Sequence, residues 1–272
     1  MYGPHKETTL VEFPDATGHI LRGILTKPDK ATRGVLMLHG FERNASVEPK
    51  FKRLADHLST MGVASLRLDY AGCGLSDGEF SHFTIASSVE VIASAEGVMN
   101  ARGLDPYGVV GHSVSGASIA ETVHQGKSPF QKIVLIAPAL NQQKLLRYWF
   151  VRVSEKKKDP AISITWANYE NLLDEAAFNL DCARTDRVSK TKLLGPDFYL
   201  ENKERDYTPL LKSVRERTLL VQGTDDEIVP LALLSADFPN QCVVNRGDHE
   251  LERPDLINAW LLYAAKFLAA SS

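Results

Sequence analysis

The chain has 272 residues, of which 44% are hydrophobic and 24% are charged, and its formal net charge is −3. These values are typical of a globular protein with a sizeable core, and the small negative charge argues against a nucleic acid or another polyanion as partner. The three cysteines, Cys73, Cys182 and Cys242, lie far apart without C-x-x-C spacing, so the sequence predicts neither a disulfide framework nor a zinc cluster.

Apolar runs and helical patterns alternate along most of the chain. The expected strands are 8–13, 19–26, 34–38, 63–68, 107–111, 132–137, 218–221 and 242–244. The expected helices are 47–61, 85–100, 115–125, a helix after Pro230, and 254–268. The first two strands are expected to form a hairpin at the sheet edge, and the alternation of the others predicts a mostly parallel, doubly wound α/β sheet.

Residues 139–208 interrupt this alternation and are rich in aromatic side chains. We interpret them as an inserted lid segment, with a core made of residues 1–138 and 209–272. The basic run at 156–158 is expected to be a solvated surface, because nothing nearby extends it. Trp149 is the first choice for a substrate-pocket residue, because its cluster lies close in sequence to the strand that ends at Ala137. The alternative is that Trp149 anchors the lid segment to the core.

A serine between small residues follows the strand at 107–111. The sequence Gly111-His112-Ser113-Val114-Ser115 is typical of a nucleophile elbow, a sharp strand-to-helix turn that exposes the hydroxyl of Ser113. Ser115 stands where glycine is usual, but a serine is still small enough for the turn. A pattern this short also fits a serine that caps a helix N-terminus, so the rest of the chain has to decide.

Two later loops carry the other groups that a serine nucleophile needs. A serine hydroxyl requires a base within hydrogen-bond reach and a third group that orients the base. Asp225 and Asp226 follow the strand at 218–221, and His249 follows the strand at 242–244. Because the carboxyl ends of parallel strands meet at one edge of a sheet, we expect these groups to converge on Ser113.

Five motifs together make the chain resemble a known family. His39-Gly40-Phe41, the stretch 69–76, Gly-His-Ser-x-x-Gly, Gly-x-x-Asp-x-x-Val-Pro and Gly-Asp-His occur in the order found in the α/β-hydrolase superfamily. Within it, the small lid segment and the Phe41 loop look most like bacterial cinnamoyl or feruloyl esterases and related carboxylesterases. The resemblance implies an α/β-hydrolase fold.

The resemblance also implies roles for particular residues. Ser113 would be the nucleophile, His249 the general base and acid, and Asp226, rather than its neighbour, the carboxylate that orients His249. The oxyanion hole would consist of two backbone N–H groups, those of Phe41 and Val114.

These expectations lead to a serine carboxylesterase that works through an acyl-enzyme and acts on esters of hydroxycinnamic acids. A thioester, a lipid ester or a carbon–carbon bond could be cleaved by the same triad, and a catalytically silent binding protein with this fold is a third alternative. We expect a small-molecule ester as substrate, no nucleic-acid partner, no cofactor and no bound metal; the oligomeric state stays open. No apolar run approaches the ~18 residues of a membrane span and no signal segment is apparent, so we expect a cytoplasmic protein.

Overall fold

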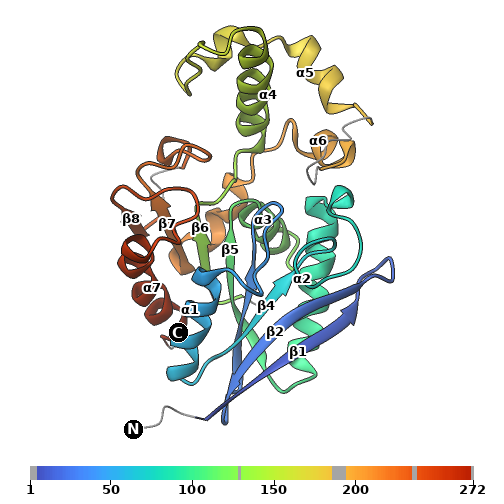
Figure 1. The fold of residues 1–272 in the computed structure, drawn as a ribbon. Coiled ribbons are helices and arrows are strands. Elements are labelled where there is room, and N and C mark those ends of the chain that lie inside the picture. Colours follow the sequence, from blue (N-terminus) through green and yellow to red (C-terminus); the bar gives the residue numbers. More distant parts are fainter. Residues whose placement is uncertain (1–4, 128–129, 186–193, 235–237, 271–272) are drawn as a thin grey trace.

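The computed structural model describes residues 5–127, 130–185, 194–234 and 238–270. The described residues form one eight-stranded sheet with the strand order β1-β2-β4-β3-β5-β6-β7-β8 (Figure 1). The strands are β1 (Lys6–Pro14), β2 (Ile20–Pro28), β3 (Arg33–Leu38), β4 (Ala64–Asp69), β5 (Asp105–His112), β6 (Lys132–Ile136), β7 (Thr218–Gly223) and β8 (Asn240–Val244). Strands β3 to β8 run parallel, while β1 and β2 form an antiparallel edge hairpin. The expected α/β sheet and its edge hairpin are confirmed.

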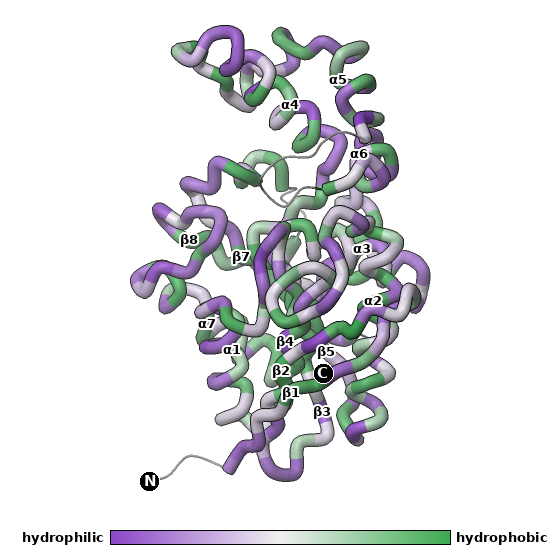
Figure 2. Tube along the Cα trace, turned by 45° about the vertical axis from the view of Figure 1, so that its right-hand side comes forward, coloured by the Kyte–Doolittle hydropathy of each residue, from purple (hydrophilic) through white to green (hydrophobic). Residues whose placement is uncertain are grey.

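Helices cover both faces of the sheet. One face carries α1 (Pro49–Thr60) and α7 (Pro254–Ala269), and the other carries α2 (Ile85–Asn100), α3 (Ser115–His124) and η3 (Thr208–Arg217). Strand β3 explains the division: Val35 and Met37 pack with the first group, while Leu36 and Leu38 pack with the second. Successive strand residues point to opposite faces, so a continuous apolar run buries both. Figure 2 shows the hydrophobic segments gathered where the strands cross the core.

The strand order places a switch point in the middle of the sheet. The chain passes from β3 to β4 on one side and then returns to β5 on the other side of β3. Loops that leave neighbouring strands in opposite directions open a crevice at their carboxyl ends, where ligands bind in folds of this kind. The loops after β3 and β5 therefore define the place to look for a site.

The lid segment forms a separate group of helices at one end of the core (Figure 1). Its elements are α4 (Gln142–Lys158), η2 (Tyr169–Leu172), α5 (Glu175–Cys182) and α6 (Pro196–Asn202). Helix α6 is tied to the core, because the Glu201 carboxylate accepts hydrogen bonds from the backbone N–H groups of Ile85 (2.7 Å) and Ala86 (2.8 Å) at the start of α2. A carboxylate at a helix N-terminus is also favoured by the helix dipole. We keep the division into core and lid segment as an interpretation.

The helix expected after Pro230 differs from the structure. Only a single 3-10 turn, η4 (Leu231–Leu233), follows Pro230, and Leu234 returns to extended backbone with φ −91° and ψ 131°. The turn has no side-chain cap, so nothing local extends it into a longer helix. The next stretch of this predicted helix, residues 235–237, lies outside the described residues. No helix in the described ranges is long and apolar enough to cross a bilayer.

Candidate active site

Ser113 lies at a strained turn between β5 and α3. Its φ of +55° falls in the left-handed region, which non-glycine residues rarely adopt. The turn depends on small neighbours: a Cβ on Gly111 would lie 2.5 Å from Ile119 Cδ1, and one on Gly116 would lie 2.6 Å from Pro138 Cβ. The local geometry is therefore that of a nucleophile elbow rather than of a helix cap.

The structure brings Ser113, His249 and Asp226 together. Ser113 Oγ lies 3.0 Å from His249 Nε2, and His249 Nδ1 lies 2.9 Å from Asp226 Oδ2. The three residues follow β5, β8 and β7, at the carboxyl end of each strand. With the Nδ1 proton donated to the carboxylate, Nε2 is left with a lone pair that faces the serine hydroxyl.

Asp226, not Asp225, faces the histidine. Asp226 is only 4% exposed, and its Oδ1 accepts backbone N–H bonds from Ile228 (2.9 Å) and Val229 (2.8 Å). Asp225 is exposed and accepts a hydrogen bond from the Thr224 hydroxyl. The two backbone donors fix one oxygen of Asp226, so its other oxygen is aimed at His249.

Gln222 is a neighbour of the acid that the sequence analysis did not single out. Its buried side-chain amide donates to Asp226 Oδ2 and to the carbonyl of Val229, both at 2.8 Å. The sequence feature that could have identified Gln222 is its place as a polar residue near the end of the apolar strand Thr218–Gly223. A buried amide in such a strand needs a hydrogen-bond partner. Gln222 thus fixes both the carboxylate and the loop that carries it.

The backbone N–H groups of Phe41 and Val114 lie on the two loops at the switch point. Phe41 follows β3, and Val114 follows Ser113 directly. Within the described ranges, neither N–H donates to another protein group. A Cβ on Gly40 would lie 3.1 Å from Ser113 Cβ and 2.9 Å from His112 Nδ1, so the two loops approach closely because residue 40 is glycine.

Three side chains, at the ends of β3 and β4 and at the start of α3, hold the Phe41 loop in place. The Ser115 hydroxyl donates to the carbonyl of His39 (2.5 Å) and receives a hydrogen bond from the Tyr70 hydroxyl (2.9 Å). His39 Nδ1 donates to the carbonyl of Gly40 (2.7 Å), and its Nε2 accepts the backbone N–H of Tyr70 (3.0 Å). The serine that departs from the usual glycine thereby ties the elbow to the Phe41 loop.

His112 supports the catalytic-site loops from behind. It is fully buried, and its Nε2 donates to the backbone carbonyl of His249 at 3.0 Å. Burial, with the nearby charge of Lys50, lowers the pKa of His112 well below its usual value, so the ring stays neutral. The neutral His112 ring thus holds the backbone of His249 and has a structural role.

Trp149 lies among the aromatic side chains of the lid segment. Its ring packs edge-on against Tyr148 at 5.5 Å between centroids, and the Arg152 guanidinium lies 4.9 Å from its centroid. Trp166 stacks on Tyr148 at 3.8 Å and also packs against a small cluster that contains Ala139 and Val229.

The cluster that contains Ala139 and Val229 is linked to the site by hydrogen bonds. The backbone N–H of Ala139 donates to the carbonyl of Ser113 (2.9 Å), and the backbone N–H of Val229 donates to Asp226 (2.8 Å). Trp166 therefore packs against a cluster that includes residues hydrogen-bonded to the triad, and its indole N–H is buried without a hydrogen-bond partner among the described residues. The sequence analysis named Trp149 and missed Trp166, because ring position depends on how the lid folds back.

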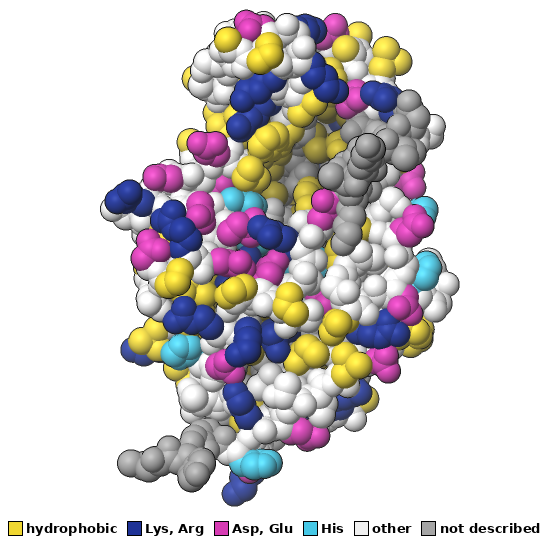
Figure 3. All heavy atoms as spheres, viewed as in Figure 1, with side chains coloured by type: hydrophobic (Ala, Val, Ile, Leu, Met, Phe, Trp, Pro, Cys, Tyr) yellow, Lys and Arg dark blue, Asp and Glu magenta, His cyan; other side chains and the backbone are white. Residues whose placement is uncertain are grey.

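A second group of rings lies beside the Phe41 loop. The Phe41 ring packs edge-on against Phe198 of α6 (5.1 Å) and against Phe80 and Phe83 (6.1 and 6.2 Å). Figure 3 shows a hollow between the lid segment and the core with hydrophobic side chains along its wall. Aromatic rings thus pack against the Phe41 loop, and others pack against the cluster that contains Ala139 and Val229.

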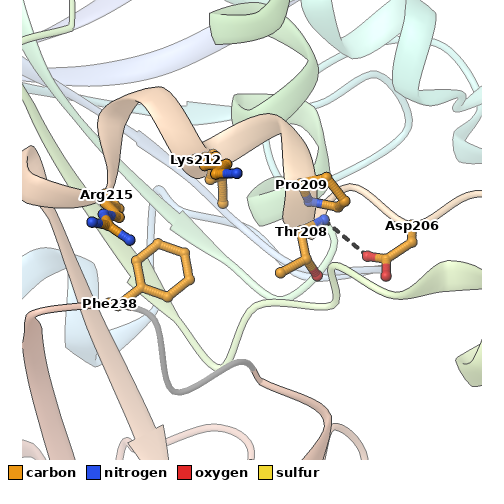
Figure 4. Close-up of a pocket in the computed structure, with 7 residues that line it drawn as sticks. Asp206, Thr208, Pro209, Lys212, Arg215 and Phe238 are labelled. Carbon is orange, nitrogen blue, oxygen red and sulfur yellow. Dashed lines mark hydrogen bonds between the residues drawn. The ribbon is translucent and has the colours of Figure 1, made fainter.

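A further pocket lies on η3 and contains none of the site residues. Thr208, Lys212 and Arg215 of η3 line it together with Phe238, and the Thr208 N–H donates to Asp206 at 2.9 Å (Figure 4). Its open wall carries no buried polar side chain aimed into it. In the described part of the chain, no group of three or more His, Cys, Asp or Glu side chains could hold a metal ion.

Comparison with known families gives the class of the protein. A family model described as the alpha/beta hydrolase fold matches residues 34–251. This range covers most of the chain, so the protein belongs to the α/β-hydrolase fold family, and the expected superfamily is confirmed. The family supports a hydrolase in general. No match is found among the sequences of curated proteins.

Several solved structures are similar to this one along nearly their whole length. The structure of Est1E from Butyrivibrio proteoclasticus with bound ferulic acid has 19% sequence identity and a TM-score of 0.67, and the match covers 95% of this chain and 97% of Est1E. An esterase from Pyrococcus furiosus has 14% identity and a TM-score of 0.63, with coverages of 98% and 95%. Mouse alpha/beta hydrolase domain-containing protein 10 has 18% identity and a TM-score of 0.64, with coverages of 96% and 98%. At these identities the likeness is one of fold.

Proposed function

We propose that the protein is a serine carboxylesterase that works through an acyl-enzyme. The observation that carries this proposal is the hydrogen-bonded series from Ser113 Oγ through His249 to the buried Asp226 carboxylate. This series has the atoms needed to remove a proton from a serine hydroxyl at neutral pH. The family match and the fold shared with esterases agree with it.

The proposed reaction has two halves. Ser113 Oγ attacks the ester carbonyl while His249 Nε2 takes its proton; the tetrahedral intermediate then collapses, and His249 gives that proton to the leaving alkoxide. In the second half, water attacks the acyl-enzyme while His249 takes its proton; the second tetrahedral intermediate then collapses, His249 returns that proton to Ser113 Oγ, and the carboxylic acid is released. In both halves the backbone N–H groups of Phe41 and Val114 would stabilise the negative oxygen.

We further propose an aromatic acyl group, of the hydroxycinnamic class. Support comes from two groups of rings, Trp166 with Tyr148 in the lid segment and Phe41 with Phe198 at the Phe41 loop. The similar structure of Est1E holds ferulic acid, which is an acid of this class. Aromatic pairs contribute about 0.5–1.5 kcal/mol each beyond area burial, a gain that a short aliphatic acyl group lacks.

The variant Ser113→Ala tests the serine mechanism. It should fold like the parent, as judged by circular dichroism and Tm, because alanine fits the small elbow. Hydrolysis of every good ester substrate should fall by several orders of magnitude. Turnover near the parent rate in a folded Ser113→Ala protein would show that Ser113 is not the nucleophile.

A panel of hydroxycinnamoyl, acetyl and long-chain esters, with the matching thioesters, tests the acyl group. If the pocket is aromatic, Trp149→Ala and Trp166→Ala should lower kcat/KM for the hydroxycinnamoyl ester more than for the acetyl ester. A ring that only anchors the lid segment would lower both alike. A parent enzyme that prefers acetyl or long-chain esters, or thioesters, would contradict the aromatic-ester proposal and leave the serine mechanism standing.

A further inference from the structure

Lys50 is a lysine without any exposed surface near the site. It is 0% exposed and is the second residue of α1, directly after Pro49. Fully buried lysines are rare, and the positive end of the helix dipole at an N-terminus disfavours a cation there. Local helix preference therefore does not explain why a lysine is buried at position 50. The explanation has to lie in its tertiary contacts.

Those contacts are three glutamates. Lys50 Nζ donates to Glu252 Oε1 (3.0 Å) and Glu250 Oε2 (3.4 Å), and it lies 3.0 Å from Glu48 Oε2 in an ion pair without hydrogen-bond alignment. Glu250 follows His249 directly, and Glu252 lies two residues further on. A cation in α1 thus holds both carboxylates that follow the histidine.

Arg43 extends the cluster to the oxyanion side. It lies two residues after Phe41, forms an ion pair with Glu250, and has its Nε 3.9 Å from Glu48 Oε1. The five residues Arg43, Glu48, Lys50, Glu250 and Glu252 form what we call the ion cluster. The ion cluster connects the loop that carries the Phe41 N–H to the loop that carries His249.

Other contacts also hold the histidine loop, and the Leu251 side chain is fully buried in the core with residues of α1 and α7. His112 donates to the carbonyl of His249, and Trp260 Nε1 donates to the carbonyl of Leu251 at 3.2 Å. The ion cluster adds the charged contacts between this loop and residues 43–50. Paired charges with little exposure, such as Lys50 and Glu48, are also poorly screened by solvent, so their attraction is stronger than that of surface pairs.

We propose that Lys50 is a positioning residue that, through the ion cluster, fixes His249 relative to the oxyanion loop. This inference rests on the proposed function. Proton transfer and oxyanion stabilisation act on the same intermediate. The His249 imidazole and the Phe41 N–H therefore have to stay at a fixed distance from each other. A displacement of about 1 Å at a catalytic group costs about 100-fold in rate.

The test compares Lys50→Met with Lys52→Met. Lys52 lies in the same helix, but it is exposed and paired only with Asp56, so its loss should leave activity unchanged. The rates are kcat/KM per active site, with the sites counted by the burst of alcohol released on acylation. Binding is the Ki of a non-hydrolysable ether analogue of the best ester.

Lys50→Met should lower kcat/KM per active site by about 10- to 100-fold and leave the Ki within a few fold of the parent. A purely structural role would instead reduce the fraction of active sites and leave the rate per site unchanged. An unchanged rate per site would overturn the proposal.

A second variant decides the question if Lys50→Met does not fold. Glu252→Gln keeps the shape of the side chain and removes one carboxylate of the cluster. It should lower kcat/KM per active site by about 3- to 10-fold, whereas Glu90→Gln, which breaks a surface pair with Lys127, should not. Equal rates per site in these two variants would overturn the proposal.

Hydrogen exchange separates this inference from the proposed function. In the Lys50 or Glu252 variant, amides at 41–47 and 248–252 should exchange faster than in the parent, and those of β5 should not. If the parent hydrolyses no ester, the proposed function fails, and exchange alone then decides whether the cluster anchors the two loops. Unchanged exchange in both loops would refute the anchoring.

Discussion

Replacing Asp226 with asparagine should nearly abolish turnover. The Asp226 carboxylate accepts four hydrogen bonds, two on Oδ1 from backbone N–H groups and two on Oδ2 from Gln222 and His249. An asparagine amide has one accepting end. If its oxygen takes the two backbone donors, its NH₂ group faces the donors of Gln222 and His249.

The imidazole would respond by changing tautomer. With the amide donating to Nδ1, the His249 proton moves to Nε2 and faces Ser113, so no base remains for the serine proton. The wrong tautomer of His249 lowers kcat by about 10,000-fold, which corresponds to an increase of about 5 kcal/mol in the activation free energy. The mismatched donors also lower the free energy of unfolding by about 1–3 kcal/mol, so the assay temperature has to lie well below Tm.

The measurement is steady-state hydrolysis of the best ester, with circular dichroism to confirm folding. Asp225→Asn is the matched control, because Asp225 is the exposed neighbour and its side chain accepts a hydrogen bond from Thr224 and not from the imidazole. Its activity should stay within about twofold of the parent. Equal losses in the two variants, or less than a tenfold loss in folded Asp226→Asn, would refute the reasoning.

Two further predictions concern residues that support the site. Ser115→Ala should lower the free energy of unfolding by about 1–3 kcal/mol in urea, because the carbonyl of His39 and the hydroxyl of Tyr70 both lose a buried partner; equal stability would show that the tie is not needed. His112 binds a proton when unfolded, at a pKa of about 6.5, but not when buried, so its contribution to stability is complete above that pH and lost below it. Between pH 6 and 5 the stability of the parent relative to His112→Gln should therefore fall by up to about 1.4 kcal/mol per pH unit, and parallel curves for the two proteins would contradict this.

Most of the fold could be predicted from the sequence because buried parallel strands have a strong signature. The runs at 34–38 and 132–137 are continuous and apolar, and they become β3 and β6 with ends shifted by one residue. The stretch after Pro230 is also apolar, but it lacks a cap and turns back to extended backbone, so composition alone misjudged it. The periodicity of apolar residues indicates which side chains are buried. Where a helix ends is decided by capping or packing.

The candidate site was predictable where backbone topology fixes it. Ser113, Asp226 and His249 each follow a parallel strand, so their convergence comes from the sheet itself. The positions of Trp149 and Trp166 depend on how the lid segment folds, for which the sequence has no comparable rule. Lys50 was missed for another reason: it looks ordinary in sequence, and only its burial makes it unusual, whereas Gln222 did carry a signal as a polar residue in an apolar strand.

The carboxylate of Glu250 lies close to His249, and the ion cluster explains why it does not face the imidazole as Asp226 does. Glu250 is the next residue in the chain and could compete with Asp226 for the Nδ1 proton. Burial would raise the pKa of Glu250, but the charge of Lys50 and the hydrogen bond from Arg43 outweigh burial and lower that pKa. Glu250 therefore stays ionised and turned toward these two cations, and the imidazole is left to Asp226. In this way the same cluster that anchors the histidine loop also removes the rival acceptor from the site.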